Sequence, residues 1–366
     1  MLRPTRRSVL RALAASPIAA ISGQASDLNA MPTRPRRIAV EEGFSIPELI
    51  DAIDNYMARS GANEPGLRAL IGNGKYPRWP KLLDPQLRIS DMIRSGVDTQ
   101  VLLVNSPGVQ IFEATEAIEL SSLINDRSAE WKRKWPNRFA PLAAIAPQAP
   151  AAAARELERA VRTLGLHGAV INSHTKGRYL DEPFYWPIFE AAETLDVPIY
   201  IHPREPAPGM LKLYSDQHLE GAIWGYAAET SLHVLRLVMA GVFDQFPNLK
   251  IVIGHNGEGI PFYLDRLDNR YRTLHAGGLG PLKLAPSEYF KRNVWISTSG
   301  SNWAPSVQFC QQVLGADRVL FAVDYPFEDE VQTVRKAAAI HMSAADSACF
   351  FHRNAERLFK IDKLKP

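Results

Sequence analysis

Eight short apolar segments, separated by longer stretches of helical periodicity, restrict the fold of this sequence more than any other feature. The segments are rich in Val, Ile and Leu and mostly lack polar–apolar alternation, a pattern typical of parallel strands that are covered on both faces. They are Arg37–Val40, Gln100–Val104, Ala140–Ile145, Gly168–Ile171, Pro198–Ile201, Lys250–Ile253, Val294–Ile296 and Val319–Val323.

The stretches between these segments repeat apolar residues at the spacing of amphipathic helices, with proline near some starts and glycine after some ends. Eight strand-then-helix units in one chain predict an α/β protein built as a closed parallel (β/α)8 TIM barrel, with residues 36–366 as one catalytic domain. Six of the predicted helices are Glu113–Trp135, Ala151–Leu164, Phe184–Leu195, Thr230–Phe246, Ala304–Leu314 and Ala344–Phe359.

The connection after the first predicted strand is unusually long. It runs from Ile46 to Leu87 and contains four glycines and several prolines between Gly61 and Pro80. Long connections in compact domains commonly carry function. We therefore expect a helical and loop insertion over the barrel mouth, which serves as a lid and determines specificity.

The N-terminus has the composition of an export signal. Four arginines and no acidic residue lie in residues 1–25, and the run Thr5-Arg6-Arg7-Ser8-Val9-Leu10-Arg11 precedes a short apolar stretch. We predict a twin-arginine signal peptide over residues 1–25, cleaved after Ala25, a linker over 26–35, and a periplasmic enzyme. The alternative is a basic tail on a cytoplasmic protein.

The charge of the remaining chain argues against two classes of partner. Without the four arginines of the N-terminus, the formal net charge of +3 becomes −1. A nearly neutral body is not expected to bind nucleic acid, or a membrane surface once the signal has been removed. The expected partner is a small-molecule substrate.

Polar residues follow the predicted strands where the chemistry of a barrel is expected, at the C-terminal ends. Glu41, His202 and Asp324 form a set of one imidazole and two carboxylates, which suits one divalent metal ion with open coordination positions. Zinc, manganese and magnesium all fit such a set. Glu42 competes with Glu41, because successive side chains of a strand point to opposite sides, and position alone does not decide between them.

Further candidates accompany this set. His255 follows a predicted strand, and Glu258, three residues later, could orient its imidazole. Arg204 and Arg266 are candidate anchors for a substrate carboxylate, because guanidinium binds carboxylate bidentately, and a surface salt bridge is an equally open role for Arg204. No glycine-rich nucleotide loop follows a strand, so we expect no organic cofactor. Two more candidate substrate contacts are His174 and Phe327, which lies beside Asp324. For His174 the sequence favours neither contact with the substrate nor its absence.

These stretches resemble the amidohydrolase-related family typified by aminocarboxymuconate semialdehyde decarboxylase. The resemblance is closer to its aromatic branch, the 5-carboxyvanillate, γ-resorcylate and 2,3-dihydroxybenzoate decarboxylases, and runs from Ile38 to about Ile361. The most specific stretches are Val40-Glu41-Glu42-Gly43-Phe44, Ile171-Asn172-Ser173-His174, Tyr200-Ile201-His202-Pro203-Arg204, Gly254-His255-Asn256-Gly257-Glu258-Gly259 and Asp324-Tyr325-Pro326-Phe327.

The resemblance implies a non-oxidative, metal-dependent decarboxylase of a hydroxylated aromatic acid of the ortho-hydroxybenzoate type. It implies Glu41 rather than Glu42 as a metal ligand with His202 and Asp324, Asp324 as proton donor, and His255, oriented by Glu258, as a catalytic residue. It also implies a homodimer or dimer of dimers in which Arg266 reaches a neighbouring site. Many relatives carry a histidine where this chain has Gly43.

Two other functions use the same residues. A metal-dependent hydrolase, such as a lactonase, would act through metal-bound hydroxide, so activated water in place of a chelating substrate distinguishes it from a decarboxylase. A binding protein that kept the pocket and lost turnover would bind its ligand without forming product.

Overall fold

The computed structural model describes residues 34–59, 62–72, 74–276 and 280–362. Apart from Arg34, these residues belong to one compact unit, Pro35–Pro366. The predicted signal peptide, and most of the predicted linker, lie outside the described residues. None of the described helices is long and apolar enough to cross a membrane.

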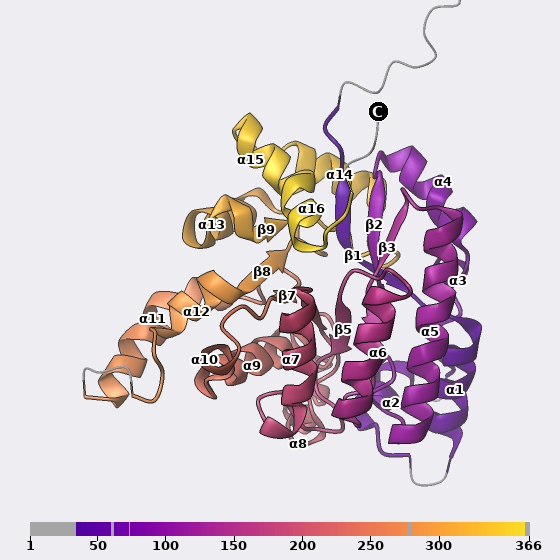
Figure 1. Cartoon of the computed structure of the whole chain (residues 1–366), viewed down its shortest axis with the longest axis horizontal. Coiled ribbons are helices and arrows are strands. Elements are labelled where there is room, and N and C mark those ends of the chain that lie inside the picture. Colours follow the sequence, from indigo (N-terminus) through magenta and orange to yellow (C-terminus); the bar gives the residue numbers. More distant parts are fainter. Residues whose placement is uncertain (1–33, 60–61, 73, 277–279, 363–366) are drawn as a thin grey trace, which may run out of the picture. The chain divides into compact units, whose positions relative to one another are not determined.

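Parallel strands form the centre of the unit (Figure 1). They pair in the orders β1-β2-β3 and β4-β5-β6-β7-β8-β9, and every pair is parallel. The strands are β1 (Ile38–Phe44), β2 (Thr99–Val104), β3 (Phe139–Pro141), β4 (Ala143–Ala144), β5 (Ala169–Asn172), β6 (Ile199–His202), β7 (Ile251–Ile253), β8 (Val294–Ser297) and β9 (Val319–Leu320).

Two backbone hydrogen bonds join the two sets of strands into a barrel. The Leu142 amide, between β3 and β4, donates to the Leu102 carbonyl at 2.8 Å, so β3 and β4 are halves of one predicted strand. The Val40 amide of β1 donates to the Phe321 carbonyl, just after β9, at 3.1 Å. All eight predicted strand positions are occupied, and the prediction of a (β/α)8 barrel is confirmed.

Helices connect the strands and cover their outer faces (Figure 1). They are α5 (Ala114–Lys134), α6 (Pro150–Arg162), α7 (Trp186–Leu195), α8 (Pro208–Ser215), α9 (Gly225–Met239), α10 (Val242–Gln245), α11 (Ile260–Leu274), α12 (Pro286–Asn293), α13 (Ala304–Leu314), α14 (Glu330–Ala338), α15 (Ala344–Ala348) and α16 (Asn354–Leu358). Short 3-10 turns lie at Pro183–Tyr185 and Ala316–Arg318, and a π-helical turn lies at Cys349–Arg353.

Two predicted helices are interrupted. The helix predicted over Thr230–Phe246 is divided into α9 and α10 at Gly241, whose φ of 72° is left-handed and ends an α-helix. The helix predicted over Ala344–Phe359 contains the π-helical turn between α15 and α16. The apolar periodicity of the sequence does not reveal either break, because the buried face of the helix continues across it.

The insertion after β1 is helical, as predicted. It contains α1 (Pro47–Ala58), α2 (Pro65–Ile71), α3 (Pro80–Leu83) and the start of α4 (Pro85–Ser95). Each of these helices begins with proline, which lacks the amide hydrogen that the first turn leaves unpaired and has a helical φ already set.

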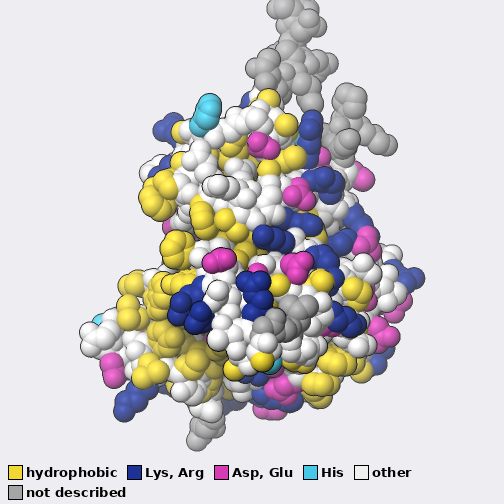
Figure 2. Space-filling view, turned by 90° about the vertical axis from the view of Figure 1, so that its left-hand side faces the viewer, with side chains coloured by type: hydrophobic (Ala, Val, Ile, Leu, Met, Phe, Trp, Pro, Cys, Tyr) yellow, Lys and Arg dark blue, Asp and Glu magenta, His cyan; other side chains and the backbone are white. Residues whose placement is uncertain are grey.

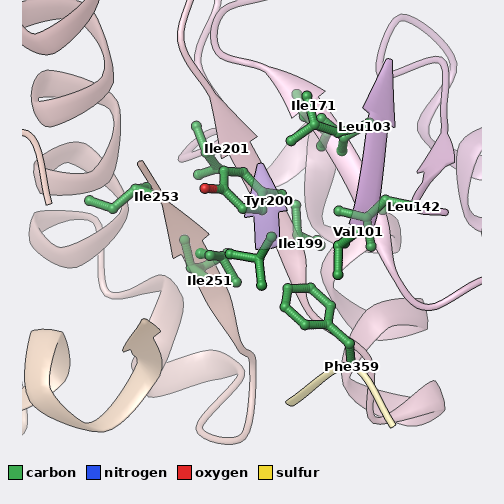
Figure 3. Packing of buried hydrophobic residues seen from close by; sticks show 14 of the residues in the cluster. Val101, Leu103, Leu142, Ile171, Ile199, Tyr200, Ile201, Ile251, Ile253 and Phe359 are labelled. Carbon is green, nitrogen blue, oxygen red and sulfur yellow. The ribbon is translucent and has the colours of Figure 1, made fainter. Parts of the chain in front are cut away.

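The core of the barrel is apolar except near the C-terminal ends of its strands. Figure 3 shows apolar side chains of β2, β5, β6 and β7 around Tyr200, with Phe359 of the C-terminal segment beneath the strands. Phe359 is 1% exposed and closes the N-terminal end of this core. The polar residues of the predicted site lie towards the opposite end, where the strands finish.

Candidate active site

An irregularity in β1 buries two adjacent glutamates. The register with β2 shifts between Ala39 and Glu42, so β1 contains an extra residue there. Glu41 and Glu42 are both 0% exposed, although a regular pleat would turn one of them away from the interior. Glu41 faces the imidazoles of β6 and β7, and Glu42 faces the segment after β9.

Glu41 is held through one of its two carboxylate oxygens. The Tyr200 hydroxyl and the Ser297 hydroxyl both donate to Oε2, the latter at 2.6 Å. The other oxygen, Oε1, is buried and accepts no hydrogen bond from the described residues. Burial raises the pKa of this carboxyl to about 7, while His255 lowers it. A β-carbon at residue 254 would lie 2.6 Å from Glu41 Oε2, so the close approach requires Gly254.

His202 presents a free ring nitrogen to that unpartnered oxygen. Asn172 is its register partner on β5, and the Asn172 Oδ1 atom lies 2.8 Å from His202 Nδ1. The amide oxygen accepts, so Nδ1 carries the hydrogen and Nε2 has a lone pair. His202 Nε2 lies 3.8 Å from Glu41 Oε1. Burial lowers the pKa of His202 to about 4, which keeps the imidazole neutral as a metal ligand must be.

His255 and Asp324 complete the group at the barrel mouth. Glu258 Oε1 lies 2.8 Å from His255 Nδ1, as predicted from their spacing. His255 Nε2 lies 3.9 Å from Glu41 Oε1 and 3.9 Å from Asp324 Oδ2. Partial burial would lower the pKa of His255, but the carboxylates of Glu258, Glu41 and Asp324 raise it well above its ordinary value. We call Glu41, His202, His255 and Asp324 the mouth group.

The donor types of the mouth group suit a cation. No group of three or more His, Cys, Asp or Glu side chains among the described residues is arranged so that it could hold a metal ion. Two ligands bonded at about 2.0–2.2 Å lie at most about 4.4 Å apart, and the separation of 3.8 Å between His202 Nε2 and Glu41 Oε1 falls within this limit. A buried carboxylate oxygen without a partner is costly. A cation bound between His202 and Glu41 would give Glu41 Oε1 the partner that it lacks among the described residues.

Gly43 leaves no free position for a further ligand. A β-carbon at residue 43 would lie 3.1 Å from Asn105 Oδ1, 3.4 Å from the Tyr325 carbonyl oxygen and 3.5 Å from the Phe327 ring. The space next to Gly43 is therefore filled by Asn105, Tyr325 and Phe327. At this position, where the resemblance leads us to expect a histidine in many relatives, the surroundings of Gly43 are packed.

A cavity of about 1060 Å³ opens next to the mouth group. His255, Glu258 and Asp324 line one end of it, and Arg266 on the exposed side of α11 lines its wall. Four further lining residues are apolar or aromatic and more than half exposed, namely Ile223, Trp224, Tyr263 and Leu274. Figure 2 looks onto the side that carries α11 and shows hydrophobic side chains gathered there.

The structure does not place Arg204 and His174 for contact with a substrate. Arg204 is 0% exposed, and its guanidinium donates to Glu64 and to Glu205, each at 2.6 Å. His174 is 1% exposed; its Nε2 lies 3.2 Å from the Glu205 carbonyl, and its Nδ1 accepts from the Gly177 amide at 3.1 Å. Both side chains are already bonded within the protein, so the predicted substrate contacts do not fit this placement.

Phe327 lies at the contact between the insertion and the segment after β9. Its ring packs on Trp79 of the insertion, with 5.3 Å between centroids, and is 47% exposed. Phe327 is not among the residues that line the cavity, although Glu328 is. The described structure therefore connects Phe327 to the insertion and not directly to the mouth group.

Three residues that hold the mouth group were not predicted. Tyr200 and Ser297 orient Glu41, and Asn172 orients His202. Tyr200 lies two positions before His202 on β6, so strand periodicity places both on one face. This spacing was a signal for Tyr200; the other two required the register of neighbouring strands.

Comparisons with known proteins identify the family of this chain. A family model described as amidohydrolase matches residues 64–361. Gamma-resorcylate decarboxylase from Polaromonas sp. (strain JS666) is 38% identical over 299 residues, which cover 78% of this chain and 91% of that protein.

Solved structures of decarboxylases are also similar to this chain. The 5-carboxyvanillate decarboxylase from Sphingomonas paucimobilis is 38% identical with a TM-score of 0.85, covering 90% of this chain and 100% of the other. The enzyme of that name from Novosphingobium aromaticivorans, in complex with manganese and 4-hydroxy-3-methoxy-5-nitrobenzoic acid, is 41% identical with a TM-score of 0.85, covering 89% and 96%. The chain therefore belongs to the amidohydrolase family, in the group that contains the γ-resorcylate and 5-carboxyvanillate decarboxylases.

Proposed function

We propose that this protein is a metal-dependent, non-oxidative decarboxylase of a hydroxylated benzoate. The observation that carries the proposal is the convergence of two carboxylates and two imidazoles beside a cavity, with one buried Glu41 oxygen left without a partner. The similarity to decarboxylases of hydroxylated benzoates supports the same reaction.

Glu41, His202 and Asp324 are the proposed ligands of one divalent metal ion. Manganese, which is bound in the Novosphingobium enzyme, is the proposed metal, and zinc and magnesium are the alternatives to test. When bound, the ion would neutralise the substrate's carboxylate and the neighbouring phenolate, two anions that repel each other in a dry pocket.

The residues of the mouth group would then move one proton. Asp324, as the carboxylic acid, donates its proton to the ring carbon that bears the carboxylate. The bond from that carbon to the carboxylate breaks, its electron pair restores the aromatic ring, and carbon dioxide leaves. Asp324 remains as a carboxylate and needs a new proton. His255, held at Nδ1 by Glu258, has its Nε2 3.9 Å from Asp324 Oδ2 and is placed to return it. The reaction needs no organic cofactor.

Arg266 is the proposed anchor of a substrate carboxylate, and a second copy of the chain is the proposed cover of the apolar cavity wall. Arg266 forms no side-chain hydrogen bond or ion pair with other described residues, unlike Arg204. A large exposed apolar area next to a catalytic cavity is typical of an interface between subunits. Mixing the variants Arg266→Ala and Asp324→Asn tests both ideas: regained activity requires that Arg266 serves the partner's site, and none regained contradicts this.

The test of the function is direct. The mature protein, stripped of metal, is reconstituted separately with manganese, zinc and magnesium and incubated with a panel of ortho-hydroxybenzoates that includes 5-carboxyvanillate and γ-resorcylate. We expect metal-dependent carbon dioxide release from at least one substrate, abolished by a chelator. Cleavage of lactones without carbon dioxide release from any benzoate would replace the proposal by a hydrolase; tight binding of a benzoate without product would indicate a binding protein.

We further propose that the protein is exported by the twin-arginine route. The proposal rests on the sequence Thr5-Arg6-Arg7-Ser8-Val9-Leu10-Arg11 and the small residues Gly23-Gln24-Ala25. Replacing Arg6 and Arg7 by lysine should retain the precursor in the cytoplasm, and the exported protein should begin at Ser26. An unchanged distribution, with the first residues still present, would indicate a cytoplasmic enzyme.

A further inference from the structure

Glu42 is a buried carboxylate that the proposed reaction does not use. It is 0% exposed, and neither of its oxygens faces the cavity lining. Its Oε1 accepts the Val323 amide at 2.9 Å, and its Oε2 accepts the Tyr325 amide at 3.0 Å. These two amides lie on either side of Asp324 in the chain. One carboxyl group therefore accepts the amides of both residues that adjoin the proposed proton donor in the chain.

The backbone of Asp324 needs such support. Its φ of 78° lies in the left-handed region, which residues with a β-carbon rarely adopt. Asp324 follows β9 by four residues, so no strand ladder sets its conformation. The Gly43 amide adds a bond to the Tyr325 carbonyl at 2.8 Å, and the Phe327 amide closes a turn onto the Asp324 carbonyl at 2.8 Å. The contacts from β1 place this turn relative to Glu41.

A second layer of buried residues holds β1 at this point. The Arg88 guanidinium donates to the Gly43 carbonyl and, at 2.9 Å, to Gln100 Oε1, and it lies 4.5 Å from the centre of the Tyr325 ring. Gln100 in turn donates to Glu330 Oε1 at 2.8 Å. Arg88 and Gln100 are 0% exposed. Arg88 thus contacts β1 directly at Gly43, whereas Glu330 is linked to β1 through Gln100 and Arg88.

We propose that Glu42 is the positioning residue for Asp324: by accepting the amides of Val323 and Tyr325, it fixes the backbone that aims the Asp324 carboxylate at the metal and at the substrate carbon. Glu41, His202 and His255 each have a side chain that orients them, and Glu42 supplies the equivalent contact through the backbone. This inference rests on the proposed function only where it concerns the role of Asp324 in turnover. The placement of Asp324 as a metal ligand is tested separately, by manganese binding.

The first experiment compares Glu42→Gln with Glu330→Gln. Glutamine keeps the size of the side chain but turns a donor NH2 group towards one of the two amides. Glu330 is a matched control, because it is 5% exposed and accepts two hydrogen bonds, from Ser95 and Gln100, but none from the Asp324 segment. Manganese affinity by titration, the electron paramagnetic resonance spectrum of bound manganese, kcat, KM and thermal stability are measured for both.

We expect Glu42→Gln to weaken manganese binding by about 10-fold or more, to change the manganese spectrum and to lower kcat by about 10–100-fold, the range of residues that orient metal ligands. KM should change by less than about 3-fold. Glu330→Gln should change manganese affinity and kcat by less than about 3-fold, even if it lowers thermal stability as much as Glu42→Gln does. Equal effects of both variants on all readouts would show that Glu42 is merely structural.

The second experiment asks whether Glu42 acts through Asp324. In an Asp324→Asn background, Glu42→Gln should weaken manganese binding much less than in the wild type, because the ligand that Glu42 positions is already altered. An undiminished second loss would overturn the proposal. Should Glu42→Gln not fold, Glu42→Asp keeps the carboxyl group but shortens its reach towards the two amides, and the same comparisons apply.

Failure of the inference and failure of the proposed function give different results. Without carbon dioxide release from the wild-type protein, the function fails, while the manganese measurements still decide whether Glu42 positions Asp324. With release intact and Glu42→Gln indistinguishable from Glu330→Gln, the function stands and the inference fails.

Discussion

Two groups of charged residues in the described structure differ in how their members are bonded to one another. In the first, Arg204 lies between the carboxylates of Glu64 and Glu205, at 2.6 Å from each. In the second, the mouth group, Glu41 Oε1 has no hydrogen-bond partner among the described residues, and the two imidazoles lie 3.8–3.9 Å away from it. Matched charges hold structure together, whereas a group left open to a further ion or ligand indicates chemistry.

The consequence for Arg204 is specific. Arginine beside a metal ligand is a natural candidate for binding a substrate carboxylate, but here protein carboxylates already use its guanidinium. Glu64 belongs to the insertion and Glu205 follows β6, so this ion group ties the insertion to the barrel. Arg266, which has no such partners among the described residues, is the better candidate for an anchor.

The largest effect is expected for the mouth group. Asp324→Asn removes the proposed proton donor but keeps the shape of the side chain, so kcat should fall by about 10³–10⁴-fold, the upper range for general acid catalysis. Thermal unfolding should change by only a few degrees. Steady-state kinetics on the metal-loaded variant measure the first quantity. Turnover within 10-fold of wild type would exclude Asp324 as the donor.

The matched ion group should respond in stability. Arg204→Met leaves two buried carboxylates without their partner, so the free energy of unfolding should fall by about 3–5 kcal/mol. Denaturant unfolding of the metal-free protein measures this change. If Arg204→Met keeps its stability but has a strongly raised KM, Arg204 binds the substrate and does not hold the insertion to the barrel.

Acid should destabilise the protein through a histidine outside the mouth group. His233 is 0% exposed and bonded to Ser173 and to the Leu180 amide, and burial lowers its pKa to about 3. The folded-state pKa is below the unfolded value of about 6.5, so this stability is present above pH 6.5 and is lost as pH falls towards 3.

The size of this effect follows from the shift. Between pH 6.5 and 5, His233 should account for a loss of at most about 2 kcal/mol, at about 1.4 kcal/mol per pH unit. Unfolding curves of wild type and His233→Gln at several pH values measure it. The variant should be less stable at pH 7.5 but lose less stability towards pH 5; parallel pH profiles would show that His233 titrates normally in the folded protein.

The smallest effect is expected for a residue that only orients a ligand. Asn172→Leu removes the acceptor for His202 Nδ1, so manganese affinity should fall by about 10-fold. Thermal stability without metal should change less than in Arg204→Met. Unchanged manganese affinity would show that packing alone sets the orientation of His202.

Much of the fold follows from local sequence. The strand segments were predictable because a parallel strand covered on both faces is continuously apolar, and their order determines a barrel once all pairs are parallel. Breaks such as Gly241 were not, because they change backbone direction without changing the apolar pattern.

The candidate site also has residues that the sequence predicts and residues that it does not. Glu41, His202, His255 and Asp324 were predictable from their places after strands, and the spacing of His255 and Glu258 predicted their contact. The sequence left the roles of Arg204 and His174 open, since whether a polar side chain is free depends on partners far away in the chain, such as Glu64.

The sequence by itself determined which strands meet and which titratable residues stand at their ends, because both depend on hydrophobic pattern and strand direction. Only the tertiary structure decided what the adjacent Glu41 and Glu42 face. A shift of register in β1 buries both, and contacts up to 283 positions apart turn Glu41 towards the imidazoles of His202 and His255 and Glu42 towards the backbone around Asp324. Local spacing contains no information about such contacts, since they form only when the barrel closes.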